Sequence, residues 1–183
     1  MLPRTSVVLT AAVAVAIAGV SVNAVSAAPA APARNIVTQM PTLAVRILDR
    51  INADRARRGL GRLHLSSRLQ ASARFHTTEM AERGFFSHSS LDGSSPWARM
   101  ARFYRSAGYR HWAVGETMNW SSGGTDAARI VADWMTSPDH RRILLARGFH
   151  EIGISAVHAS APSGSFQGAA ITLVTADFGA RAR

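Results

Sequence analysis

Cysteine is absent from this chain of 183 residues, and the absence narrows both the fold and the chemistry. Without thiols there can be no disulfide framework, no cysteine nucleophile and no zinc–sulfur site. The fold must therefore be held together by packing alone. Any chemistry has to use histidine, carboxylate, hydroxyl groups and water.

Several catalytic motifs are also missing. The sequence contains no Gly-x-Ser-x-Gly turn, which argues against a hydrolase of the α/β class. It lacks the His-Glu-x-x-His helix of metalloproteases, the P-loop and the glycine-rich dinucleotide fingerprint. We therefore expect neither a nucleotide nor a dinucleotide cofactor.

Lysine is absent too, so all 21 basic residues are arginine, and the formal net charge is +10. A GC-rich genome, which favours arginine codons, explains this composition without any function. The functional alternative is adhesion to anionic envelope polymers or lipid headgroups, because guanidinium groups bind such oxyanions in a bidentate manner. The arginines are spread along the chain and no nucleic-acid motif is present, so nucleic acid is not an expected partner.

Long apolar runs are confined to the N-terminus. Arg4 precedes an apolar stretch over residues 7–22, and Val25-Ser26-Ala27 is typical of a cleavage site. Residues 1–27 are therefore predicted to be a signal peptide, and the mature protein to be secreted, in the extracellular space or the cell envelope. An uncleaved membrane anchor is the alternative; after cleavage no segment reaches the roughly 18 apolar residues that span a bilayer.

The rest of the chain divides into a tether and one domain. Residues 28–41 are rich in alanine and proline and have no apolar periodicity, which predicts a short tether. Residues 42–183 are enough for one domain that buries a sizeable core.

Helical periodicity dominates the first part of this domain. Helices are predicted from Pro41 to about 57, from 66 or 67 to Gly84, from 97 to about 106, after a Thr125 cap, and from Pro138 onward. Residues 114–118 are predicted to be extended, and residues 151–158 and 169–177 alternate like strands. The pattern predicts an α+β layered domain with an antiparallel sheet.

Two histidines and one carboxylate lie at the edges of different predicted elements. His88 follows the second helix, Glu116 is an isolated acid in an apolar strand, and His140 is in the first turn of the last helix. Ser137 is predicted to cap that helix by accepting the His140 backbone N–H. Less specific interpretations remain open: His88 could simply fix a loop, and capping geometry alone could explain His140.

The order of these landmarks resembles the CAP superfamily, which includes cysteine-rich secretory proteins, antigen-type venom proteins and plant pathogenesis-related proteins. The chain is most similar to the bacterial, cysteine-free SCP-like branch. The resemblance runs from about residue 48 to 179. It rests on Ile51-Asn52-x-x-Arg55, Phe86-Ser87-His88, Ala107-Gly108-Tyr109, Gly115-Glu116, Trp134-x-x-Ser137-Pro138-x-His140-Arg141, Phe149-x-x-Ile152-Gly153 and Asp177-Phe178-Gly179.

The resemblance implies a three-layer α-β-α sandwich with a central antiparallel sheet and a cleft lined by histidine and acidic residues. By position, His88, Glu116 and His140 match family residues that bind a divalent cation, often zinc. Imidazole nitrogen and carboxylate oxygen suit that ion. Ser137 stands in the cleft where many relatives have a second glutamate, and Thr117 replaces an asparagine, so the four-residue cluster is reduced to three.

Three functions remain open from the sequence. The leading hypothesis is a secreted binding protein whose cleft captures a small ligand (a lipid, sterol, glycan or peptide) at the cell envelope, with a divalent cation as organiser. The second is a metal-dependent hydrolase of peptide or cell-wall material. The third is an extracellular effector acting by protein–protein contact. Whether the protein is an enzyme is left undecided, because the sequence offers no spare general base.

Overall fold

The structure is a computed structural model that describes residues 34–183, so the predicted signal peptide and the first part of the predicted tether, residues 28–33, lie outside it. No helix within the described range is long and apolar enough to cross a membrane. Five α-helices are present there: α1 Pro41–Ala56, α2 Ser67–Arg83, α3 Pro96–Phe103, α4 Ala127–Thr136 and α5 Pro138–Leu144. The strands are β1 Val37–Gln39, β2 His64–Leu65, β3 His111–Ser122, β4 Glu151–Ala159 and β5 Ile171–Ala182.

The strands form one open sheet in the order β1-β4-β5-β3, and β2 adds to β4 off this path. Strands β1, β4, β5 and β3 pair antiparallel, whereas the short β2 runs parallel to β4. Strands β3 and β5 stay in register from His111↔Ala182 to Ser122↔Ile171. This confirms the predicted α+β class and its antiparallel central sheet.

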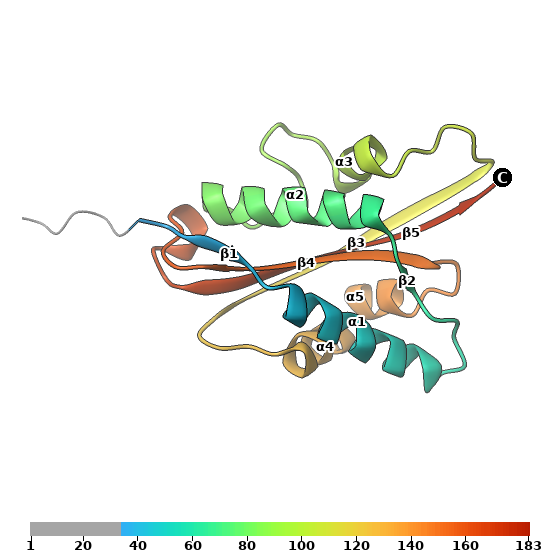
Figure 1. The fold of residues 1–183 in the computed structure, drawn as a ribbon, viewed down its shortest axis with the longest axis horizontal. Helices are drawn as coiled ribbons and strands as arrows, with labels where there is room; N and C mark the ends of the chain where they lie inside the picture. Colours follow the sequence, from blue (N-terminus) through green and yellow to red (C-terminus); the bar gives the residue numbers. More distant parts are fainter. Residues whose placement is uncertain (1–33) are drawn as a thin grey trace, which may run out of the picture. The chain divides into compact units, whose positions relative to one another are not determined.

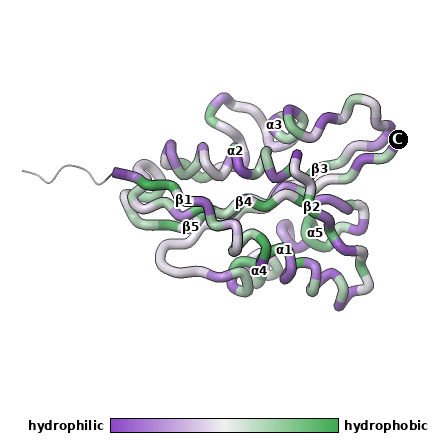
Figure 2. Tube along the Cα trace, viewed as in Figure 1, coloured by the Kyte–Doolittle hydropathy of each residue, from purple (hydrophilic) through white to green (hydrophobic). Residues whose placement is uncertain are grey.

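Helices cover both faces of the sheet, as Figure 1 shows: α2 and α3 lie on one face, and α1, α4 and α5 on the other. The two faces alternate along β5, because successive side chains of a strand point in opposite directions. Val174 and Phe178 pack into the core with α1 and α4, whereas Ile171 and Leu173 pack with α2. Hydrophobic and hydrophilic residues alternate along the helices as well (Figure 2). The predicted three-layer sandwich is confirmed.

Two polar residues of α1 hydrogen-bond through their side chains to backbone groups elsewhere in the chain. Asn52 accepts from the backbone N–H of Leu63 (2.8 Å) and donates to the carbonyl of Leu63 (3.1 Å). The guanidinium of Arg55 is buried and donates to carbonyls of two chain segments, which fastens the end of α1 to the segment that follows α5. These carbonyls belong to Gly61, Leu144, Ala146 and Phe149.

One glycine lets α2 approach the sheet. A Cβ at Gly153 of β4 would lie 2.0 Å from the backbone nitrogen of Gln70, so no larger residue fits without moving the helix. Another glycine ends the helix: Gly84 has φ 70° and donates its N–H to the Met80 carbonyl. This left-handed residue turns the chain away from α2 and into the loop that carries His88.

The structure differs from the sequence-based prediction at two helix starts. The side chain that caps α4 is Asp126, which accepts from the Arg129 N–H at 2.8 Å, and not Thr125. Ser137 does precede α5, but its hydroxyl makes no capping hydrogen bond to His140. The prediction of a Ser137 side-chain cap was therefore wrong. The predicted start of the helix is confirmed: Pro138, which has no N–H to satisfy, is the first residue of α5.

Strand boundaries also differ. Residues 37–39 fall in the predicted tether but form β1, and the Met40 N–H that follows donates to the carbonyl of Ala156 (2.8 Å). Strand β3 extends well beyond the predicted segment 114–118, because all of its twelve residues pair with β5. Cross-strand pairing outweighs the local preference of the polar residues at its ends.

A buried polar layer lies between α2 and the sheet. Four of its side chains make no hydrogen bond to any other residue in the range 34–183, and they belong to Ser72, Ser155, Thr175 and Asp177. Asp177 is fully buried and stands opposite Glu116 in the β3–β5 register. Burial raises the pKa of Asp177 well above its usual value, and the negative charge of Glu116 raises it further. Asp177 is therefore a neutral carboxylic acid under mildly acidic conditions.

This predicts a stability difference between the wild type and Asp177→Asn that depends on pH. The folded state holds the Asp177 proton over a range in which the unfolded chain, with an ordinary pKa of about 3.9, has lost it. The free energy of unfolding of the wild type should fall relative to that of Asp177→Asn as pH rises above 4, by up to about 1.4 kcal/mol per pH unit.

Urea unfolding of both proteins at several pH values between 4 and 7 measures this difference. All other ionisable groups are common to the two proteins, so a difference that does not change with pH would contradict a raised Asp177 pKa.

Candidate functional site

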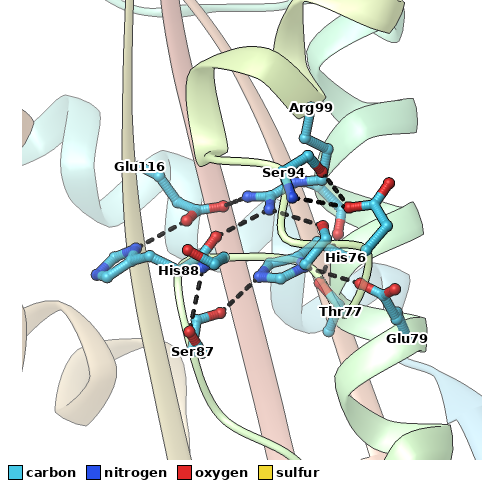
Figure 3. Close-up of polar contacts among 12 residues, drawn as sticks. His76, Thr77, Glu79, Ser87, His88, Ser94, Arg99 and Glu116 are labelled. Carbon is cyan, nitrogen blue, oxygen red and sulfur yellow. Dashed lines mark hydrogen bonds and ion pairs between the residues drawn. The ribbon is translucent and has the colours of Figure 1, made fainter.

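The candidate site is centred on Glu116, which is buried in the middle of β3. One carboxylate oxygen, Oε1, lies 2.7 Å from Nδ1 of His88, and the other, Oε2, forms an ion pair with Arg99 of α3. Figure 3 shows Glu116 between these two partners. The side chain of His88 is 52 % exposed while that of Glu116 is 2 % exposed, so the pair links solvent to the interior.

Arg99 connects three parts of the chain. Besides its ion pair with Glu116, its Nη1 donates to the carbonyl of His88 at 2.9 Å and to the hydroxyl of Ser90 at 3.1 Å. Its side chain is completely buried. Arginine is seldom buried unless it is paired, and these partners meet that requirement. The guanidinium thereby fixes both the Glu116 carboxylate and the loop that carries His88.

Sequence reasoning missed Arg99. The available signal was its position in a short helix beside Met100, the other buried residue of α3. An arginine on the buried face of a helix needs an acidic partner, yet that partner lies on β3 and only the tertiary fold brings the two together.

Two neighbouring groups offset the effect of burial on the pKa of Glu116. Burial by itself would raise the pKa of Glu116, but the hydrogen bond from His88 and the positive charge of Arg99 outweigh it and leave the pKa below its usual value. Glu116 is therefore ionised at neutral pH, next to Asp177 of β5, whose pKa is raised. Over the pH range in which Asp177 keeps its proton, the two neighbouring carboxyl groups together carry a single negative charge, which Arg99 balances.

His76 supports the His88 loop from α2. It is buried there, and its Nε2 donates to the carbonyl of Ser87 at 2.8 Å, while Nδ1 lies 3.4 Å from Oε2 of Glu79. Burial, followed by the positive charge of Arg99, lowers the pKa of His76 and favours the neutral ring. His76 is therefore a core histidine with an acid nearby.

A cleft of about 550 Å³ opens beside His88 and Glu116. Most of its wall is apolar and comes from α3, β3 and α5: Pro96, Trp97, Met100, Val114 and Ile143. Ser89 and Ser95 supply hydroxyls, and Ser95 already caps α3 by accepting from the Ala98 N–H at 3.3 Å. The site therefore combines an apolar wall with a polar corner, which is formed by His88, Glu116 and Arg99.

The other predicted site residues lie apart from this corner. His140 is half-buried in the first turn of α5 and does not line the cleft. Burial and the nearby charge of His88 lower the pKa of His140, so its ring is neutral at neutral pH. Ser137 precedes α5 and does not line the cleft either. Among residues 34–183, no group of three or more histidine and acidic side chains is arranged to hold a metal ion.

Comparison with known proteins supports the assignment of the fold. The curated protein YkwD of Bacillus subtilis, which is uncharacterized, is 30 % identical over 142 residues. The match takes in 75 % of this chain and 53 % of that protein, so the chain spans about half the length of this relative.

Two solved structures share the fold. An outer surface protein from Borrelia burgdorferi superposes with a TM-score of 0.61 at 20 % identity, over 80 % of this chain and 99 % of that one. An extracellular protein containing an SCP domain from Bacillus anthracis gives 0.56 at 23 % identity, over 75 % and 40 %. The profile of the CAP family, the cysteine-rich secretory protein family, matches residues 48–177. The chain belongs to the CAP family.

Proposed function

We propose that this chain is an extracellular binding protein whose cleft captures a small, largely apolar ligand that carries one polar group. The observation that carries the proposal is the 550 Å³ cleft, with its apolar wall and the His88–Glu116–Arg99 corner. Its volume is in the usual range for small-molecule sites, and a few polar groups in an apolar wall are typical of them.

The lining favours a lipid- or sterol-like ligand body over a glycan. Trp97, Met100 and Ile143 offer apolar contact area, whereas a sugar needs several hydrogen-bonding partners around its ring. Nε2 of His88 is available for the polar group, because Nδ1 is engaged by Glu116 and about half of the side chain is exposed. An envelope location fits the printed descriptions of the relatives, one an outer surface protein and the other extracellular.

Hydrolysis is less well supported by the same geometry. A general base must be free to take a proton and should have a pKa near the working pH. Both oxygens of Glu116 are engaged, by His88 and Arg99, and its pKa is lowered. Asp177 is fully buried and does not line the cleft. We therefore place ligand binding ahead of the metal-dependent hydrolase.

A matched pair of tryptophan variants tests the cleft. Trp97 lines it and is 64 % exposed, whereas Trp120, 40 % exposed, lies outside it against Phe166. The affinity for a fluorescent fatty acid should fall about tenfold in Trp97→Ala, as for removal of an interfacial aromatic anchor. Trp120→Ala should leave the affinity unchanged.

Fluorescence titration of the probe into each variant gives both affinities. The proposal is overturned if the probe shows no saturable binding to the wild type, or if Trp97→Ala binds it as tightly as the wild type does.

A divalent cation, zinc in particular, is a second candidate ligand that one observation favours. A carboxylate that holds Nδ1 of a histidine leaves Nε2 oriented for a metal, which is a common arrangement around bound zinc. His88 has this arrangement, and His140 is a nearby neutral imidazole. In this arrangement Glu116 orients His88 and is not itself a ligand. Imidazole nitrogens suit such an ion, whereas a three-ligand set is not assembled among residues 34–183. A bound cation would attract the polar group of the captured molecule.

Metal content after dialysis against zinc tests this second candidate. We expect the wild type to retain zinc at neutral pH and to release it at acid pH, below the ordinary imidazole pKa of about 6.5, because imidazole must be neutral to coordinate a metal. His88→Ala/His140→Ala should retain none. The control His111→Ala/His158→Ala removes two exposed histidines and should behave like the wild type. Equal zinc in both double variants would rule out the imidazole site.

A further inference from the structure

A second cavity, here called the arginine pocket, is lined by residues from the start of α2 and the end of β5. Figure 1 shows these two element ends at the same end of the sandwich. The arginine pocket has a volume of about 430 Å³ and shares no lining residue with the cleft. Three of its six lining residues are arginines; the set is Arg68, Phe103, Arg105, Ala107, Tyr109 and Arg181. No acidic residue lines it.

Arg181 is held in place by aromatic rings. Its Cζ lies 3.8 Å from the ring centroid of Tyr104 and 4.6 Å from that of Tyr109. Its side chain is only 10 % exposed, and Nη1 makes a long hydrogen bond to the carbonyl of Arg105 (3.4 Å). Stacking of this kind fixes a guanidinium without neutralising it. Arg181 is therefore a pre-oriented cation.

Positive charge is in excess around the pocket. Glu151 is the nearby acid, but it accepts a hydrogen bond from the Tyr104 hydroxyl and lies 4.0 Å from Nε of Arg181. That buried Nε has no hydrogen-bond partner within residues 34–183. Burial, followed by the hydrogen bond and charge of Glu151, raises the pKa of Tyr104, so the phenol stays neutral and adds no negative charge.

The two remaining arginines face solvent. Arg68, in the first turn of α2, and Arg105, just after α3, are exposed. Neither side chain makes an ion pair with an acidic residue of the described range. Counted against Glu151, the three guanidinium groups leave two positive charges without a counter-charge. An arginine on an ordinary solvated face is mobile. Here, by contrast, one of the three arginines, Arg181, is buried and stacked on aromatic rings and is therefore fixed in place.

We propose that the arginine pocket binds a phosphate group. A phosphate monoester carries a charge between about −1.5 and −2, which matches the excess, and its oxygens suit the planar fork of arginine. The volume exceeds that of the ion alone, so the phosphate can be part of a larger molecule, with Phe103 and Tyr109 beside its organic portion. This site is independent of the cleft and of the function proposed for it.

A titration with glycerol phosphate, followed by the backbone amide signals in NMR spectra, tests the proposal. The wild type should show saturable shifts that start at residues 103–109 and 181. Arg68→Ala/Arg105→Ala should bind at least about tenfold more weakly, as expected for the loss of hydrogen bonds between charged groups. Raising the salt concentration should weaken binding to the wild type.

The matched control is Arg46→Ala/Arg50→Ala, which removes the same charge from the exposed face of α1 on the other side of the sheet. It should bind as the wild type does. Equal weakening in both double variants would reduce the effect to net charge and overturn the proposal, as would the absence of saturable shifts in the wild type.

Arg181→Lys separates a shaped site from a simple positive patch. Lysine keeps the charge but lacks the planar fork, so glycerol phosphate should bind this variant several-fold more weakly. An affinity equal to that of the wild type would contradict the role given to the stacked guanidinium.

A second experiment distinguishes a phosphate carried by a lipid from one carried by a soluble molecule or a polymer. Co-sedimentation with phosphatidylglycerol vesicles, against phosphatidylcholine vesicles, tests a lipid headgroup. Vesicle binding that Arg68→Ala/Arg105→Ala loses supports a lipid source for the phosphate. Binding of glycerol phosphate without vesicle binding supports a soluble or polymer-borne phosphate. Vesicle binding that the variant keeps, together with no response to glycerol phosphate, overturns the proposal.

Discussion

The buried ion pair between Arg99 and Glu116 is the interaction on which the rest of the site depends. It joins α3 to the edge strand β3, and the same guanidinium holds the carbonyl of His88. Taking two charges out of water is costly, and it succeeds here because both groups have further partners. Without Arg99, Glu116 would be a buried anion without the guanidinium that balances its charge, and the His88 loop would lose its anchor.

The Arg99–Glu116 ion pair also explains how two carboxyl groups can lie next to each other in the interior. Glu116 and Asp177 face each other across β3 and β5, and a single guanidinium cannot balance two charges. The structure separates them by environment: Glu116 is ionised beside Arg99, and Asp177, fully buried, has a raised pKa. His88 thereby keeps an ionised partner, and its outer nitrogen is left for the cleft. The polar corner of the cleft is thus a consequence of charge balance in the core.

Local periodicity predicted an α+β layered domain with an antiparallel sheet, and the resemblance to the CAP superfamily implied the three-layer sandwich. Asn52 and Arg55, two landmarks of that resemblance, hydrogen-bond to backbone carbonyls through their side chains. The sequence also placed His88 and Glu116 in one site, and they are in contact. It could not predict the role of Arg99, since the partner of this arginine, Glu116, lies on a strand elsewhere in the chain. Pro138 begins the helix as predicted, but the Ser137 hydroxyl makes no capping bond, so the predicted side-chain cap was wrong. The roles given to His140 and Ser137 stay predictions.

A double-mutant cycle on Arg99 and Glu116 tests the central claim most directly, with stability measured by urea unfolding. Arg99→Met and Glu116→Gln should each cost about 3–5 kcal/mol, because each leaves a buried partner without its counter-charge. The double variant should be less destabilised than the sum of the two, with a coupling energy of at least about 2 kcal/mol. Additive costs would contradict the account, since they would mean that the two side chains contribute to the fold independently.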